Sequence, residues 1–225
     1  MSVPFEPNFC FPLPESIEND KVRLVPFDPL IYAEAFVNAS KDHAWLFDHL
    51  PYGPWQTADD MITEFLDPII HSDPGAVLFA VLDKRSPGTP LAGIMAYKDS
   101  SAARLVAEIG YVTTLPAFQR THVSTNAVAV LMRYALDALG VRRLEWRANS
   151  MNARSIGLAM RMGFSLDGVL RWDRVLPAWK RGNGREISEK DVKPGTIGRD
   201  SAVLSVCWDD WANGVRAVVI KAEQR

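Results

Sequence analysis

The sequence predicts a mixed α/β fold of the α+β type, with helices packed on a mixed, mostly antiparallel central sheet. Three strand-like apolar runs follow one another between residues 76 and 113, with short polar breaks between them. The hydrophobic period then changes from two to about 3.6 at residues 124–139, which is typical of an amphipathic helix. Strand-like and helix-like segments alternate again after it. A chain of 225 residues can bury a sizeable core without disulfides or metal, so one large domain is expected.

The first 75 residues predict an irregular arm, one strand and two helices. Residues 1–20 are interrupted by prolines, and residues 21–27 alternate apolar and charged side chains as a strand does. The Asp-Pro pair at 28–29 is a typical helix start with proline in the first turn, so a helix over about 29–39 is expected. A second helix is expected to begin near Thr57, after which apolar residues recur at four-residue spacing.

The next segment predicts an antiparallel meander of three strands. The apolar runs cover residues 76–82, 91–97 and 104–113. A Ser-Pro-Gly turn at 86–88 separates the first two, and the polar residues 98–102 separate the second and third. Short breaks of this kind join neighbouring antiparallel strands.

The second half of the chain predicts two helices and three strands. The helix over 124–139 is followed by Gly140, where a left-handed C-cap residue belongs. Apolar and charged residues then alternate, as in a half-buried strand. The remaining expected elements are a strand over 143–148, a helix over about 153–162, and strands over 164–174 and 202–208.

A polar stretch at residues 179–200 separates the last two strands and contains four glycines and a proline. Loops longer than about 12–15 residues are uncommon in a compact domain and tend to be functional or disordered. We therefore expect an irregular arm at 1–20, a single domain at 21–211 with this long loop, and a C-terminal tail at 212–225.

The composition indicates a soluble, cytoplasmic protein. Apolar content of 48% and charged content of 23% are ordinary for globular proteins and exclude a disordered or collagen-like chain. The N-terminus lacks the basic and apolar regions of a secretory signal, and no apolar run reaches about 18 residues, so no membrane association is expected. Cys10 and Cys207 are far apart and outside any metal-binding spacing, which favours two unpaired thiols.

The net charge of −2 conceals an asymmetry. Residues 142–185 hold nine arginines and Lys180 against three acidic residues, a local charge of +7, so the rest of the chain carries −9. This basic block is either a solvated helix face or a surface that receives an anion such as a nucleotide phosphate.

Three places in the sequence are candidates for chemistry. The junction between the strand ending at Thr114 and the next helix directs unpaired amides outward, which suits either a phosphate or an ordinary helix cap. Asn152 and Ser155 open a helix and are either caps or functional groups. Glu108 shares an otherwise apolar strand face, so its carboxylate is either paired or kept for proton transfer.

Taken in order, these segments resemble the GNAT superfamily of acyl-CoA N-acyltransferases, and within it the RimJ/RimL-type branch. The similarity covers about residues 20–211 and is weaker in the first half. Its most specific part is N-x-x-S followed by G-F-x-x-x-G-x-x-R. The matching segments are 107–112, 116–125, 143–146, 152–155 and 161–171.

The resemblance implies a GNAT fold with helices on both faces of the sheet and acetyl-CoA as cosubstrate. Its pantetheine is expected along the strand from Glu108 to Thr114, and its pyrophosphate on the backbone amides of residues 122–125. Glu108 is implied as general base, directly or through water, and Ser155 as the acid that protonates the leaving thiolate. The implied cofactor-binding residues are Val112, Thr113, Thr114, Gln119, Arg120, Thr121, His122, Val123, Ser124, Thr125, Asn152 and Ser155.

The sequence departs from the family pattern in two places. The family's loop is Q/R-x-x-G-x-G/A, and here His122 and Ser124 occupy the two glycine positions, where glycine permits close backbone approach. The hydroxyls of Thr121, Ser124 and Thr125 are expected to replace lost contacts. The helix after Asn152 also lacks the tyrosine that serves as acid in other branches, which assigns that role to Ser155 or to solvent.

We therefore expect an acetyl-CoA-dependent N-acetyltransferase that acts by direct attack of a primary amine, from a protein N-terminus or a small molecule. Part of the basic block, Arg154 and Arg161 especially, is expected to face the cofactor phosphates. The alternative is a non-enzymatic CoA-binding or partner-binding domain; nucleic-acid binding is a distant third. The four histidines lack metal spacing, so no metal is expected. A monomer or homodimer is expected, with Asp48, Asp59 and Asp60 as candidates for recognising a cationic acceptor and 179–200 as a lid.

Overall fold

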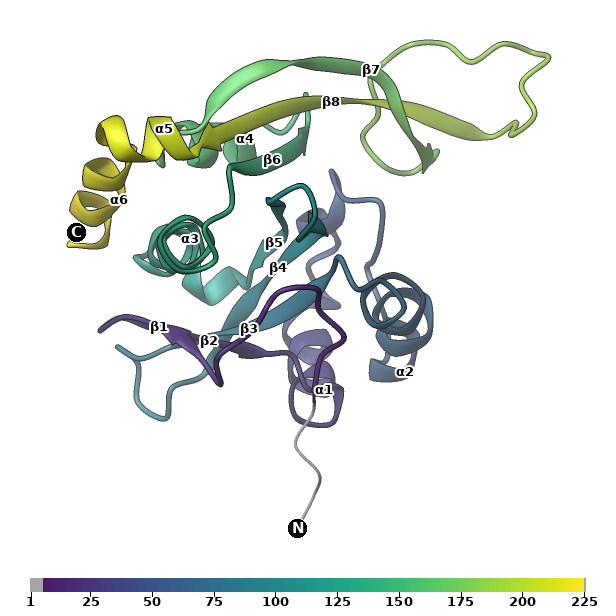
Figure 1. Ribbon diagram of the computed structural model, residues 1–225. Helices are drawn as coiled ribbons and strands as arrows, with labels where there is room; N and C mark the ends of the chain where they lie inside the picture. Colours follow the sequence, from purple (N-terminus) through teal and green to yellow (C-terminus); the bar gives the residue numbers. More distant parts are fainter. Residues whose placement is uncertain (1–5, 225) are drawn as a thin grey trace.

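The computed structural model describes residues 6–224, and its centre is an eight-stranded sheet of order β1-β2-β3-β4-β5-β6-β8-β7 (Figure 1). Neighbouring strands are antiparallel except for the parallel pair β5 and β6. The strands are β1 (Ile17–Glu18), β2 (Val22–Pro26), β3 (Val77–Asp83), β4 (Leu91–Ser101), β5 (Val106–Thr114), β6 (Arg143–Asn149), β7 (Ser165–Pro177) and β8 (Thr196–Cys207). The expected mixed, mostly antiparallel sheet is confirmed.

Helices cover both faces of the sheet, and the alternation of side chains along the strands explains why. Val77 and Phe79 of β3 face one apolar core, whereas Leu78 and Ala80 face the other. The first core is closed by α3 and the C-terminal helices, and the second by α1 and the helix of α2 and η2 (Figure 1). The helical segments are α1 (Pro29–Ser40), η1 (Ala44–Phe47), α2 (Ala58–Met61), η2 (Ile62–His71), η3 (Pro116–Phe118), α3 (Val123–Arg133), η4 (Tyr134–Ala138), α4 (Ala153–Arg161), α5 (Trp208–Asp210), η5 (Trp211–Val215) and α6 (Arg216–Glu223).

The helix boundaries fall where the sequence predicts them, because the terminal side chains satisfy the free backbone groups. The Asp28 carboxylate accepts a hydrogen bond from the Leu30 amide at 2.9 Å and caps α1. Thr57 and Asp60 form a reciprocal capping box at the start of α2. Gly140 follows the helix of α3 and η4 with φ of 63°, the left-handed conformation expected of it.

The long loop expected at 179–200 is shorter than predicted. β7 and β8 continue as a two-stranded ribbon beyond the sheet, with Pro177 paired to Thr196, so the connection is limited to residues 178–195 (Figure 1). Residues 196–200 were missed because a ribbon without a third strand requires no apolar alternation.

The C-terminal segment expected as a tail is also different, because η5 and α6 continue the chain as helix to Glu223. Val219 is buried in the first core, and the Lys21 Nζ donates to the Glu223 carbonyl oxygen at 2.6 Å. Gly214 has a φ of 141° and interrupts the helix. A glycine at this position disfavours a helix in a sequence-based prediction, which is why the helix was not expected.

The expected N-terminal arm, as far as residues 6–20 describe it, is largely irregular, and residues 1–5 lie outside the described part. Phe11 and Ile17 are buried in the first core, and Ile17 belongs to β1, which pairs with β2. Cys10 and Cys207 are both free thiols. Within residues 6–224, no helix combines the length and the apolar character needed to cross a membrane.

Candidate active site

The site begins where two parallel strands separate. β5 and β6 pair only from Val106 with Arg143 to Glu108 with Glu145. Beyond this point β6 pairs with β8 on its other side, up to Asn149. The edge of β5 that faces β6 is therefore without a strand partner from residue 109 onward, and its backbone groups are available to a ligand.

A β-bulge on β5 lies at the same place. The register with β4 shifts by one residue between Thr113 and Gly110, and Tyr111 between them has φ of 52°. A non-glycine residue in this conformation costs about 1–3 kcal/mol, and bulges recur beside active sites because they redirect a strand. The Tyr111 ring packs edge-on against Tyr52 and Phe65, at centroid distances of 5.3 and 5.1 Å.

The separated strands form the walls of a cleft of about 470 Å³. Its lining comes from four parts of the chain: residues 45–50, β5 with the loop and the start of α3 after it, β6 with α4, and one residue of β8. Predicted site residues that line it are Val112, Thr113, Thr114, Gln119, Arg120, Thr121, Ser124, Thr125, Asn152 and Ser155. Glu108, His122 and Val123 do not line it.

The loop before α3 holds its shape without the two glycines of the family pattern. His122 has φ of −65°, and Ser124 is within the helix, so both positions suit any residue. The left-handed position is Arg120 instead, with φ of 61°. Ser124 Oγ and Thr114 Oγ1 share a hydrogen bond of 2.8 Å that fixes the helix start to the end of β5.

The His122 and Val123 side chains contact the body of the protein and not the cleft. His122 Nε2 lies 2.9 Å from Asp83 Oδ1, at the end of β3. Burial favours a higher pKa for Asp83, but hydrogen bonds from Ser86, the Arg85 amide and His122 outweigh it and lower that pKa. Val123 is buried in the first core. Both side chains thus anchor the start of α3 to the sheet, next to Ser124 and Thr125, which line the cleft.

Asn152 and Ser155 stand on the opposite wall, at the start of α4. The Asn152 side-chain oxygen accepts from the Ser155 amide at 3.1 Å, so it caps the helix. Ser155 Oγ accepts from Trp146 Nε1 at 3.0 Å. Because an indole N–H only donates, this contact leaves the Ser155 hydroxyl proton unused, and Ser155 lines the cleft.

The basic block divides into two groups. Arg154 and Arg161 of α4 line the cleft together with Arg120. Arg143 instead pairs with Glu145 and Asp167, at 2.7 and 2.5 Å. Ion pairing accounts for part of the positive charge in this stretch of sequence. The arginines that line the cleft form a cationic rim.

Glu108 is 2% exposed and lies between two cations. Its Oε1 is 3.3 Å from Lys98 Nζ, and its Oε2 is 3.5 Å from Arg147 Nε. Burial raises the pKa of Glu108 to about 7, against the opposing effects of Lys98 and Arg147. Arg147 lines the cleft, so Glu108 is separated from it by the Arg147 side chain.

Most residues at the far end of the cleft carry no signal in the sequence. Trp45, Leu46, His49 and Leu50 line it from residues 44–50, and Arg199 lines it from β8. Burial lowers the pKa of His49, with Arg181 adding to the effect, so its imidazole is neutral at pH 7. No local motif marks these residues, because the end is assembled from segments about 150 positions apart.

A buried lysine holds this end together. Lys180 Nζ donates to the carbonyl oxygens of Tyr52 and Gly53 at 2.6 and 2.7 Å, and to that of Phe47 at 3.2 Å. Lys180 is 6% exposed, and burial lowers its pKa to about 8, partly offset by Asp48. The start of the 178–195 connection thus fastens the wall. Of the segment 179–200 that was expected as a lid, only Arg199 lines the cleft, and it lies on β8.

The three carboxylates expected to recognise a cationic acceptor do not line the cleft. Asp48 pairs with Arg181 at 3.2 Å, and Asp60 belongs to the capping box of α2. Asp59 lies in the first turn of the same helix. These side chains have local structural roles, since each lies at or beside a helix end.

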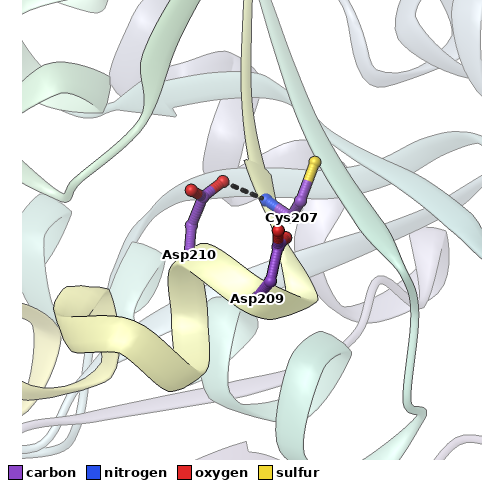
Figure 2. A group of neighbouring side chains, drawn as sticks. All are labelled: Cys207, Asp209 and Asp210. Carbon is purple, nitrogen blue, oxygen red and sulfur yellow. Dashed lines mark hydrogen bonds between the residues drawn. The ribbon is translucent and has the colours of Figure 1, made fainter.

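One acidic cluster in the described part of the chain has the compactness of a metal site. Ligand atoms of Cys207, Asp209 and Asp210 lie within 4.8 Å of one another (Figure 2). Asp210 accepts from the Cys207 amide at 2.9 Å, as Figure 2 shows, and so caps the short helix α5. Capping accounts for the cluster, and we assign no metal to it.

Comparisons with known proteins agree with this geometry. The family model of the acetyltransferase (GNAT) domain matches residues 21–165. A probable acetyltransferase of the GNAT family from Chromobacterium violaceum ATCC 12472 is 30% identical, with 94% of this chain and 97% of that one covered and a TM-score of 0.74. A GCN5-related N-acetyltransferase from Brucella melitensis is 27% identical, with coverages of 94% and 86% and a TM-score of 0.74.

A more distant structure has a more specific description. The ribosomal-protein-S5-alanine acetyltransferase from Vibrio fischeri is 18% identical, with 87% of this chain and 98% of that one covered and a TM-score of 0.63. At this identity the likeness concerns the fold. No curated protein matches the chain significantly.

Proposed function

Because the chain belongs to the GNAT family of acetyltransferases, we propose that it moves the acetyl group of acetyl-CoA to a primary amine by direct attack in a ternary complex. The observation that carries the proposal is the cleft between β5 and β6. It combines an unpaired strand edge, a helix N-terminus and a rim of cations, which are the features that an extended, phosphorylated cosubstrate requires.

The residues of the cleft fit acetyl-CoA from one end to the other. The backbone of Val112, Thr113 and Thr114 offers hydrogen bonds to the amides of pantetheine. The amides of residues 122–125 and the side chains of Gln119, Arg120 and Thr121 are assigned to the pyrophosphate. The Val123 amide donates to Thr121 Oγ1 at 3.3 Å and would exchange this hydrogen bond for one to phosphate. Asn152 and Ser155 border the pantetheine from α4, and Arg154 and Arg161 add positive charge.

Two side chains are assigned to the movement of protons. Ser155 is oriented by Trp146 so that its hydroxyl proton is available to a departing thiolate. Glu108, with a pKa of about 7, accepts the proton of the amine through water, since Arg147 separates it from the cleft. Bound acetyl-CoA supplies the thioester, and a backbone amide near Val112 or Thr113 is placed to stabilise negative charge on its carbonyl oxygen.

The acceptor is an amine of a protein N-terminus or of a small molecule. The RimJ/RimL-like motifs support a protein N-terminus, which is also what the name of the Vibrio fischeri neighbour describes for that protein. We propose the sequence-defined domain at 21–211, completed by η5 and α6, as the catalytic unit, because α6 packs on α3, the helix whose first turn lines the cleft.

Thiol release tests the proposal. The full chain is incubated with acetyl-CoA and panels of peptides with free N-termini, polyamines, aminosugars and amino acids. We expect CoA to appear in proportion to one of these amines. CoA binding without thiol release from any amine would favour a non-enzymatic domain, and absence of CoA binding would contradict the cofactor site.

A further inference from the structure

The far end of the cleft has the wrong charge for a simple cationic acceptor. The ionisable side chains that line it are Arg147, Arg199 and the neutral His49, and no carboxylate lines the cleft. An ammonium group therefore finds no anionic partner on the cleft surface, whereas an anionic group does.

Arg199 is the most unusual of these residues. It is 7% exposed, its Nε is buried without a hydrogen-bond partner, and it makes no ion pair with the described carboxylates. Its one hydrogen bond is a long one, from Nη1 to the His49 carbonyl oxygen at 3.5 Å. A buried guanidinium with so few partners costs several kcal/mol unless a ligand satisfies it.

The surroundings do not neutralise Arg199. Asp173 is already paired with Arg174 at 3.5 Å and accepts from Ser201 at 2.6 Å. Asp200, the next residue, points to Arg185 at 2.8 Å. Burial lowers the pKa of Arg199, and Arg174 adds to the effect, while Asp173 and Glu108 act against it. The guanidinium thus remains a positive group at the cleft with free donor capacity.

The neighbours of Arg199 add further buried polar atoms. His49 Nδ1 is buried without a hydrogen-bond partner, and the buried Tyr52 hydroxyl lies near the Thr113 side chain. Both side chains belong to residues 44–54. Hydrogen bonds from Lys180 to three carbonyl oxygens of this segment fix its backbone, so the positions of these polar groups are fixed as well. A fixed cluster of unsatisfied polar groups beside a cleft is the mark of a ligand subsite.

We propose that the acceptor amine carries a carboxylate close to its amino group and that Arg199 binds this carboxylate. The inference rests on the proposed acetyltransfer and names its substrate class: an amino acid with its own carboxylate, or a peptide N-terminus followed by an acidic side chain. Arginine suits the task because its planar donors match two carboxylate oxygens. The same positive charge lowers the pKa of a nearby amine and so favours the neutral form that attacks.

Matched substrates test the proposal. Thiol release is followed with amino acids and with their carboxamides, and separately with peptides that carry Asp or Asn at the second position. Each pair differs only in the negative charge. We expect kcat/KM to be about 10-fold to 100-fold higher for the carboxylate member of one pair, and the pair that responds identifies the source of the carboxylate.

Two variants connect this preference to Arg199. Arg199→Gln should remove it by raising KM for the carboxylate substrate, and Arg199→Lys should restore part of it. Arg171→Gln, on the exposed surface of β7, removes a positive charge outside the cleft and should leave the preference unchanged. Thermal unfolding and CoA affinity of each variant show whether it is folded.

A binding measurement gives a second readout. Calorimetric titration of the CoA complex with the responding amino acid or peptide should give a Kd about 10-fold to 100-fold weaker in Arg199→Gln than in the parent, with no such difference for the carboxamide. Equal rates and affinities for both members of every pair, in a protein that releases thiol, would overturn the inference alone. No thiol release from any amine would overturn the proposed function instead.

Discussion

The two ends of the cleft are built in different ways. The cofactor end consists of contiguous pieces of chain: an unpaired strand edge, the loop that follows it and two helix starts, at 109–125 and 152–161. The acceptor end brings together residues 44–54, Lys180 and Arg199, which meet only in the folded protein. Backbone groups dominate the first end, and buried charges dominate the second. Under the proposed function, the cosubstrate is bound by features that short stretches of sequence encode, whereas the acceptor is recognised by residues that only tertiary contacts bring together.

The largest expected effect concerns Glu108, the proposed general base. Glu108→Gln should lower kcat at least about 100-fold while CoA affinity stays unchanged, because a base is lost and no cofactor contact is. In the parent, kcat should rise with pH through about 7, since the carboxylate must be ionised to accept a proton. In Glu108→Gln, this rise of kcat with pH through about 7 should be absent.

Glu145→Gln is the matched control. It removes a neighbouring carboxylate that also contacts Arg147 but whose pKa is lowered: burial opposes the shift, and hydrogen bonds from Arg143 and Arg147 outweigh burial. In this variant, kcat should still rise with pH near 7. If kcat of the parent instead rises with pH below 6.5, and this rise disappears in His49→Gln, the general base is His49 and not Glu108.

Ser155→Ala should lower kcat by about 10-fold to 100-fold with little change in either substrate's affinity, because the leaving thiolate loses its proton donor. Ser165→Ala, at an exposed position of β7, is the control. Single-turnover kinetics measure the effect on the chemical step. If the single-turnover rate of Ser155→Ala equals that of the parent, solvent and not Ser155 protonates the leaving thiolate.

Lys180→Met should perturb the acceptor end alone. Loss of three hydrogen bonds to carbonyl oxygens should lower the free energy of unfolding by about 2–3 kcal/mol and raise KM for the amine. CoA affinity should be unchanged, since Lys180 does not line the cleft. Lys190→Met in the exposed connection is the control, and denaturant unfolding with substrate kinetics gives both quantities. Weakened CoA binding would contradict the division into two ends.

Arg161→Ala should perturb the cofactor end alone and has the smallest expected effect. The affinity for CoA should fall about 3-fold to 10-fold, because one exposed cation is lost from the rim, and high salt should reduce the difference. KM for the amine should not change. Arg171→Ala provides the charge-matched control, and titration calorimetry measures the affinity. An unchanged CoA affinity would place Arg161 outside the phosphate site.

The sequence predicted the sheet and the covering helices because these depend on local signals, and most of the residues proposed for the cofactor from the family resemblance line one cleft. Short sequence segments are enough to recognise the hydrophobic periodicity, the helix caps at Asp28 and Thr57, and the helix start at Asn152–Ser155. Arg199 and His49 gave no such signal, since their burial comes from pairing between distant segments. Glu108 was recognised by its apolar strand face, but its separation from the cleft by Arg147 depends on side-chain packing.

The central claim is that acetyl-CoA occupies the opening between β5 and β6, and amide hydrogen exchange in the presence and absence of CoA tests it most directly. The account predicts that CoA slows exchange at residues 109–114 and 122–125 and leaves residues 44–54 unchanged. Unchanged exchange at 109–114, with protection elsewhere in the chain, would contradict it.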